Sequence, residues 1–155
     1  DAVGGGYTVG RRLEIMKDSR IGTYGGVALL LALGLKAVLL VDAEPVWLAL
    51  LVTPAIGRLT PLLLMRFLPY VTDPDTSKSK PVAEAFSRQR LLLAVLFTVV
   101  VALLFSVWLP ALLAVVLVAL LWGASLKRQL GGYTGDTLGA SVVFTELVFL
   151  LGLTL

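Results

Sequence analysis

The sequence predicts an all-α, polytopic membrane protein, and three observations support this fold class. Of its 155 residues, 58% are hydrophobic and 15% are charged, whereas roughly a quarter are charged in soluble domains. The mean hydropathy is +0.95, which corresponds to more apolar surface than a soluble core of this size can bury. The apolar residues also fall into stretches long enough, or nearly so, to cross a hydrocarbon core, which takes about 20 helical residues.

These stretches are expected to form about five transmembrane helices. They are residues 24–41, 47–65, 91–109, 111–126 and 137–155. The third and fourth are separated only by Pro110, and one straight helix through both would be longer than a bilayer is thick, so we expect a tight hairpin there. The chain opens on Asp1 without a signal-peptide pattern, and we interpret residues 1–155 as a single membrane domain that is a fragment of a larger one.

Polar segments connect the apolar stretches. Residues 10–22 are expected to form an amphipathic helix that lies on the membrane surface. Residues 42–45 are an acidic connector, residues 66–90 a long cytoplasmic loop, and residues 127–136 a short Gly-rich loop. Each of these segments then lies at one end of a helical bundle.

The placement of Lys and Arg predicts which face is cytoplasmic, because cytoplasmic loops retain these residues. All but two of the 13 Lys and Arg residues lie in the interfacial helix, the long loop or the Gly-rich loop: Arg11, Arg12, Lys17, Arg20, Arg66, Lys78, Lys80, Arg88, Arg90, Lys127 and Arg128. Five alternating crossings of the cell membrane (inner or plasma) place these segments together, and Asp42 and Glu44 on the other side. We therefore expect a cytoplasmic active face.

Three charged residues, Lys36, Arg58 and Glu146, lie inside the predicted spans. A charge there is costly unless it is paired or faces a polar cavity. Glu146 is a partner for either cation. The sequence leaves open whether such a pair only stabilises the bundle or belongs to a transporter or channel subunit.

Cysteine and histidine are both absent, which excludes disulfides, thiolate or imidazole metal sites, and nucleophiles that depend on these residues. A bound metal must then have oxygen ligands, which favours Mg²⁺ held by carboxylates and substrate phosphates. The net charge of +3 is modest and predicts no nucleic-acid partner.

The interfacial segment carries carboxylates and cations at helical spacing. Arg11, Glu14 and Asp18 would share one helix face, and the two carboxylates, one turn apart, are suited to sharing a divalent cation. The phosphate-binding candidates of this segment are Arg11, Arg12, Lys17 and Arg20. The alternative is a solvated helix whose charges form ordinary ion pairs.

A second group of candidates precedes the last span. Thr134, Asp136 or Thr137 would cap that helix, and the free amides at its N-terminus attract phosphate. The phosphate-binding candidates here are Lys127, Arg128, Thr134, Gly135 and Thr137. The alternative is a purely structural cap in which Gly135 and Gly139 allow close helix packing.

Two of these segments resemble the signatures of a known family. Residues 12–25 read RLEIMKDSRIGTYG and resemble the first signature of the cobalamin synthases, also called adenosylcobinamide-GDP ribazoletransferases. Residues 131–140 read GGYTGDTLGA and resemble the second. The resemblance covers the whole chain and is weakest between residues 66 and 90. Two long motifs in the right order, separated by apolar spans, make it specific.

The resemblance implies a Mg²⁺-dependent membrane transferase that joins α-ribazole, or its 5′-phosphate, to adenosylcobinamide-GDP and releases GMP, a late step of cobalamin (vitamin B12) biosynthesis. Its partners would be these two substrates and the lipid bilayer, and the sequence leaves open whether it forms a homo-oligomer. The residues then expected to bind metal are Asp1, Asp18 and Glu14, and the catalytic carboxylates are Asp18, Glu14 and Asp136. Catalysis would depend mainly on positioning and charge neutralisation.

The chain departs from the family pattern in two places. The family's Asp-x-x-x-Asp-x-x-Asp motif precedes the first signature, and Asp1 matches only its last member. We therefore expect this chain, without the upstream aspartates and spans, to lack part of its metal site and to be inactive alone. After Pro69-Tyr70 the family carries a Gly-Leu-Gly loop, whereas here an insert with Lys78 and Lys80 follows.

Two other functions remain open at this point. A CDP-alcohol phosphotransferase also uses membrane-embedded aspartates and Mg²⁺, although its spaced Asp-Gly…Ala-Arg…Gly…Asp…Asp pattern is not visible. The non-enzymatic alternative is a transporter or channel subunit, and the absence of an internal repeat in the sequence weighs against it.

Overall fold

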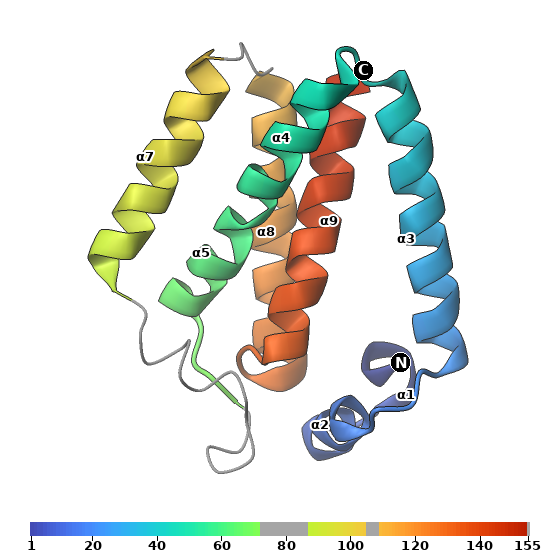
Figure 1. The fold of residues 1–155 in the computed structure, drawn as a ribbon. Coiled ribbons are helices and arrows are strands. Elements are labelled where there is room, and N and C mark those ends of the chain that lie inside the picture. The colour runs from blue at the N-terminus through green and yellow to red at the C-terminus, as the bar shows by residue number, and fades with distance from the viewer. Residues whose placement is uncertain (72–86, 105–108, 155) are drawn as a thin grey trace.

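The computed structural model describes residues 1–71, 87–104 and 109–154, and the regular secondary structure in these ranges is helical (Figure 1). Four segments are long and apolar enough to cross a membrane: α3 (Thr23–Asp42), the pair α4 (Val46–Gly57) and α5 (Leu59–Phe67), α8 (Leu109–Leu130) and α9 (Gly135–Thr154). A further helix, α7 (Arg88–Leu104), has a shorter apolar part, Leu91–Val101. The predicted all-α, multi-pass membrane fold is confirmed.

Helix α9 lies at the centre of the bundle and contacts α3, α4, α5 and α8 (Figure 1). It can do so because apolar residues point in several directions around it, as a buried helix requires. Phe149 packs in one core cluster with Ala111, and Leu150 packs in another with Leu39. Gly152 allows α8 to come close, since a Cβ there would lie 2.7 Å from the Cα of Ala111.

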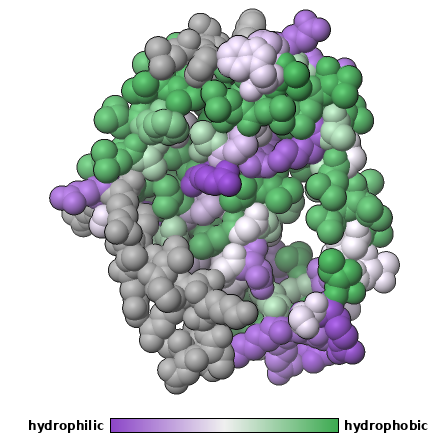
Figure 2. Space-filling model, in the orientation of Figure 1, coloured by the Kyte–Doolittle hydropathy of each residue, from purple (hydrophilic) through white to green (hydrophobic). Residues whose placement is uncertain are grey.

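Helix α3 is attached to the bundle mainly through its C-terminal half. Only 6% of the residues in its most apolar stretch are buried. Its core residue Leu39 packs in one cluster with Ala43, Ala49 and Leu150. Figure 2 shows an opening between the lower half of α3 and the rest of the molecule, and hydrophobic side chains covering the outer surface. Such a surface is suited to lipid.

Pro110, which was expected to separate the third and fourth spans, lies within helix α8. Helix α7 is described over Arg88–Leu104 and α8 over Leu109–Leu130, and residues 105–108 lie outside the described residues. The second span is divided at Arg58 into α4 and α5.

The interfacial helix is shorter than the predicted 10–22. Helix α2 ends at Lys17 after beginning at Val9. The carboxylate of Asp18 accepts a hydrogen bond from the backbone N–H of Arg20, at 3.0 Å. This local bond is an alternative to continuing the helix, and it turns the chain toward α3.

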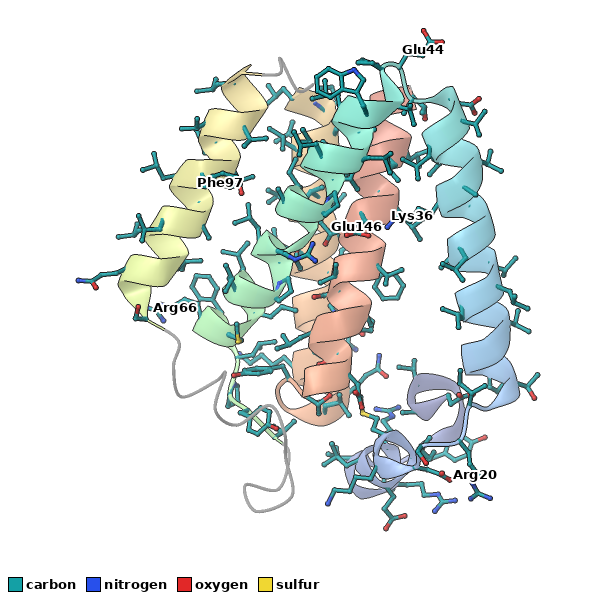
Figure 3. All side chains as sticks on the ribbon, in the orientation of Figure 1. Arg20, Lys36, Glu44, Arg66, Phe97 and Glu146 are labelled. Atoms are coloured by element: carbon teal, nitrogen blue, oxygen red, sulfur yellow. The ribbon has the colours of Figure 1, made fainter. Side chains whose placement is uncertain are left out.

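Most charged residues of the described segments lie toward the two ends of the bundle. Arg20 and Arg66 lie at the lower end in Figure 3, and Glu44 lies at the upper end. Helices α5 and α7 extend into the predicted loop 66–90 from both sides, and Lys78 and Lys80 fall outside the described residues. The following sections concern the lower end.

Candidate functional site

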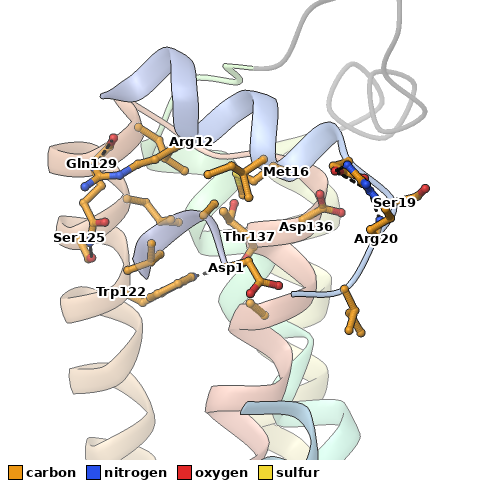
Figure 4. A pocket seen from close by; sticks show the side chains of 18 residues that line it. Asp1, Arg12, Met16, Ser19, Arg20, Trp122, Ser125, Gln129, Asp136 and Thr137 are labelled. Atoms are coloured by element: carbon orange, nitrogen blue, oxygen red, sulfur yellow. Dashed lines mark hydrogen bonds and ion pairs between the residues drawn. The ribbon is translucent and has the colours of Figure 1, made fainter. Parts of the chain in front are cut away.

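A cavity of about 400 Å³ lies at the lower end of the bundle, between the short helix α1 (Ala2–Gly5), helix α2 and the facing ends of α8 and α9 (Figure 4). Both signature segments contribute to its lining. The charged and hydroxyl-bearing residues that they supply are Arg12, Asp18, Ser19, Arg20, Asp136 and Thr137, and Asp1, which precedes the first signature, lines the cavity as well. Segments more than 100 residues apart in the sequence therefore face one space.

Asp18 and Arg20 form an exposed ion pair at the rim of this cavity. The guanidinium donates from Nη2 to Oδ2 at 2.8 Å and from Nε to both carboxylate oxygens at 3.1 Å. The hydrogen bonds from Arg20 hold the pKa of Asp18 below its usual range. Because the side chains are 88% (Arg20) and 40% (Asp18) exposed, solvent and ligands can compete for either partner.

The carboxylate of Asp1 caps helix α3 across a long sequence separation. Oδ2 accepts from the backbone N–H of Gly22 at 2.8 Å, and Oδ1 accepts from that of Gly25 at 3.0 Å. A Cβ on either glycine would collide with the carboxylate, so glycine permits this close approach. The helix N-terminus favours the negative charge, and Asp1 is held beside the cavity.

Arg12 connects three elements instead of pointing freely at a ligand. Its Nε donates to the carbonyl of Gly6 at 2.8 Å and its Nη1 to the carbonyl of Gln129 at 3.0 Å. The second acceptor, the Gln129 carbonyl, belongs to the last turn of α8, where carbonyl groups find no N–H donor within the helix. Arg12 therefore ties α2 to α8 and closes one side of the cavity.

Thr134 and Thr137 cap helix α9 reciprocally. The hydroxyl of Thr134 accepts from the N–H of Thr137 at 3.3 Å, and the hydroxyl of Thr137 accepts from the N–H of Thr134 at 2.9 Å. Both threonines are buried, whereas Asp136 between them is exposed. Within the described part of the chain, the Asp136 carboxylate makes no hydrogen bond or ion pair, which leaves it available to a ligand.

The loop before α9 is held against the end of α5. Tyr133 donates its N–H to the carbonyl of Pro69 at 2.9 Å and accepts from the N–H of Val71 at 3.1 Å. Gly132 must be glycine here because a Cβ would collide with the Pro69 carbonyl. Gly131 has φ of 79°, which glycine adopts without strain. Burial raises the pKa of Tyr133, so its phenol stays neutral.

Several predicted site residues lie outside the cavity. Arg11 and Glu14 face solvent and pair with each other at 3.0 Å, so Glu14 is not brought to Asp18. The reason is that α2 ends at Lys17, one residue before the predicted helical face would reach Asp18. The predicted phosphate-binding residues that do not line the cavity are Arg11, Lys17, Lys127, Arg128, Thr134 and Gly135. Gly139 meets open space, so it does not pack closely against another described helix.

Sequence reasoning missed the wall that α8 contributes. Trp122, Ser125 and Gln129 line the cavity from one face of that helix. Gln129 donates from Nε2 to Ser125 Oγ at 2.7 Å, and the indole N–H of Trp122 donates to the carbonyl of Thr137 at 3.2 Å. The spacing of three and four residues between them on an apolar helix was the available signal.

Two of the three charged residues inside the spans, Lys36 and Glu146, meet at mid-height of the bundle (Figure 3). Lys36 donates to Glu146 Oε2 at 2.6 Å, with side chains 34% and 9% exposed respectively. Arg58 is exposed and donates instead to the carbonyl of Pro54 at 2.9 Å. Of the two partners that the sequence left open for Glu146, the structure thus pairs it with Lys36.

The sequence was also compared with known proteins. It matches the family model described as Cobalamin-5-phosphate synthase over residues 1–154. Similar proteins named adenosylcobinamide-GDP ribazoletransferase occur in Vibrio parahaemolyticus (44% identical, covering 99% of this chain and 60% of the relative) and Polaromonas sp. (42%, 99% and 63%). That of Shewanella woodyi is 41% identical, covering 100% of this chain and 64% of the relative. The chain thus spans less than two thirds of these relatives. No solved structure matches it.

Proposed function

This chain belongs to the cobalamin-5-phosphate synthase family, and from that premise we propose that it takes part in joining α-ribazole, or its 5′-phosphate, to adenosylcobinamide-GDP with release of GMP. The proposal rests on one observation: both signature segments line the same cavity. The names of its relatives support the same transferase activity. The reaction would be a late step of cobalamin biosynthesis.

The proposed reaction needs positioning and charge neutralisation more than a strong nucleophile. A hydroxyl of α-ribazole forms a bond to the corrinoid-side phosphorus of the GDP linkage, and the bond from that phosphorus to the departing GMP breaks. Asp136, exposed and unpaired among the described residues, accepts the proton of the hydroxyl. Arg20 exchanges Asp18 for a phosphate oxygen, since its fork of donors suits either anion.

We further propose Mg²⁺ as the cofactor. No group of three Asp or Glu side chains within the described ranges is placed to hold a metal ion. Mg²⁺ commonly takes only one or two carboxylates together with waters and substrate phosphates, so the carboxylate of Asp18 at the cavity rim fits it in ligand type. When bound, the ion would neutralise charge on the pyrophosphate. Asp1 is engaged with two backbone N–H groups and serves first to position α3.

We also propose that the cavity faces the cytoplasm of the cell. The excess of Lys and Arg at this end supports that orientation. Since this chain has no cysteine, single cysteines can be introduced at Gly10 and Glu44, at opposite ends of the bundle, in a background free of others. In intact spheroplasts a membrane-impermeant maleimide should label Glu44→Cys and spare Gly10→Cys. The reverse pattern would overturn the orientation.

The activity is tested with the purified full-length protein, Mg²⁺, adenosylcobinamide-GDP and α-ribazole 5′-phosphate, by following GMP release. Asp136→Asn should lower turnover by about 100-fold or more, since a positioned base contributes on the order of 10²–10⁴-fold. Asp42→Asn, an exposed carboxylate at the opposite end, is the matched control and should keep full activity. Absence of GMP with the folded wild-type protein would remove the proposed function, and wild-type turnover in Asp136→Asn would remove the role of that residue.

A further inference from the structure

Trp122 belongs to the wall that α8 contributes to the cavity. It lies seven residues before Gln129 on α8, which corresponds to about 10 Å along the helix. In Figure 4, Trp122 and Arg20 lie on opposite sides of the cavity. A ligand that fills this space therefore touches both an aromatic ring and a charged pair.

The indole ring is held in a fixed orientation. Its N–H donates to the carbonyl of Thr137 at 3.2 Å, and its edge meets the ring of Phe144 at a centroid distance of 4.9 Å and an angle of 75°. A ring fixed in this way binds a flat ligand with little further loss of conformational freedom. Trp122 is only half-buried and lines the cavity, so part of its surface remains available.

Trp122 shares the cavity with several aliphatic side chains, and its own N–H is already paired. The aliphatic residues that share the cavity with it include Ala2, Val3, Ile15 and Leu126. Ser125 and Gln129 bond to each other, and the indole N–H is used by Thr137. Guanine carries several donors and acceptors on its edge, and those that found no partner among the aliphatic side chains would be costly to bury. A bicyclic base with few polar edge groups suits this end better.

We propose that Trp122 is the stacking platform for the base of α-ribazole, with the ribose directed toward Asp136 and any 5′-phosphate toward Arg20. The inference rests on the proposed function and assigns the nucleoside half of the reaction to this cavity. The base of α-ribazole is a benzimidazole, which is flat and largely apolar. Stacking on an aromatic side chain binds a base through its flat face and needs no hydrogen bonds to its edge.

The kinetic test replaces Trp122 with Leu and with Phe in the full-length protein. Trp122→Leu should raise KM for α-ribazole 5′-phosphate on the order of 10-fold, leaving kcat within about 2-fold and KM for adenosylcobinamide-GDP unchanged. Trp122→Phe, which keeps a ring, should recover much of the lost affinity. Trp47→Leu, at an exposed tryptophan in the opposite half of the bundle, is the control and should change neither constant. A rise in KM for adenosylcobinamide-GDP instead, or a fall in kcat alone, would overturn the assignment.

A binding measurement keeps the inference testable apart from turnover and from the folding of the Trp122 variants. In a protein whose other tryptophans are replaced by phenylalanine, α-ribazole alone should quench Trp122 fluorescence, and GMP should not. Quenching would support the stacking site even if the wild-type protein released no GMP, in which case the transferase proposal alone would fail. Lack of quenching by α-ribazole, or equal quenching by GMP, would overturn the stacking site.

Discussion

The two ion pairs Arg20–Asp18 and Lys36–Glu146 have nearly the same length, 2.8 and 2.6 Å, and very different surroundings. The first is exposed at the rim of a cavity. The second, the buried pair, joins two helices at mid-height of the bundle, with Glu146 buried and Lys36 half-buried. An exposed pair contributes little to stability and exchanges partners readily. A buried pair cannot lose one partner without leaving an uncompensated charge. From this comparison we propose ligand binding for the first pair and helix packing for the second.

The largest expected effect on stability comes from breaking the buried pair. Glu146→Ala leaves Lys36 without its carboxylate in an apolar environment, which should lower the free energy of unfolding by about 3–5 kcal/mol. Denaturant unfolding of the protein in detergent micelles measures this loss.

The matched control replaces both partners by side chains of similar length and no charge. The double variant Lys36→Met/Glu146→Met should recover most of the stability, because removing both charges also removes their desolvation cost. If the double variant is as unstable as Glu146→Ala, the loss of unfolding free energy comes from packing and not from the unpaired charge.

A smaller loss is expected from filling the space beside Glu146. A Cβ on Gly57 would lie 2.7 Å from the Cγ of Glu146, so Gly57→Ala should cost about 1–3 kcal/mol through displacement of the pair. Gly34→Ala is the control, since that Cβ meets nothing within 4 Å and alanine favours a helix. The same unfolding assay should find Gly34→Ala at least as stable as wild type; equal losses in both variants would contradict the account.

The smallest expected effect is a shift of pH dependence at the exposed pair. Arg20 lowers the pKa of Asp18 in the folded protein, so the pair is intact at neutral pH and is lost only as the pH falls through that lowered pKa. Arg20→Gln should return the pKa toward the ordinary value of about 3.9, which moves the acidic limb of kcat/KM to higher pH. Arg11→Gln, which breaks the exposed Arg11–Glu14 pair of α2, should leave the acidic limb of kcat/KM in place. A limb that is unmoved by Arg20→Gln would separate Asp18 from the reaction.

The transmembrane architecture was predictable because the length of an apolar stretch and the side on which Lys and Arg fall are local properties of the sequence. The clustering of the two signatures followed from the same reasoning. Pro110 was expected between two spans and lies within the described part of α8, because spacing alone does not show on which side of a helix boundary a proline falls.

The details of the site depended on contacts that spacing does not contain. The face shared by Glu14 and Asp18 was expected from an uninterrupted helix, whereas the bond from the Arg20 N–H to Asp18 competes with the helix. The pairing of Lys36 with Glu146 spans 110 residues and had an equally plausible rival in Arg58. In the sequence, Trp122 cannot be distinguished from an aromatic residue of the core, because its position beside the cavity depends on how α9 packs against α8.

The central claim is that the exposed pair serves the reaction and the buried pair serves the fold. The most direct test measures GMP release and the unfolding midpoint for Asp18→Asn beside Glu146→Ala in the same full-length protein. Asp18→Asn should abolish turnover while membrane insertion and the unfolding midpoint stay at wild-type values, and Glu146→Ala should lower the midpoint. Wild-type turnover in Asp18→Asn, or an unfolding midpoint lowered as far as that of Glu146→Ala, would contradict the account.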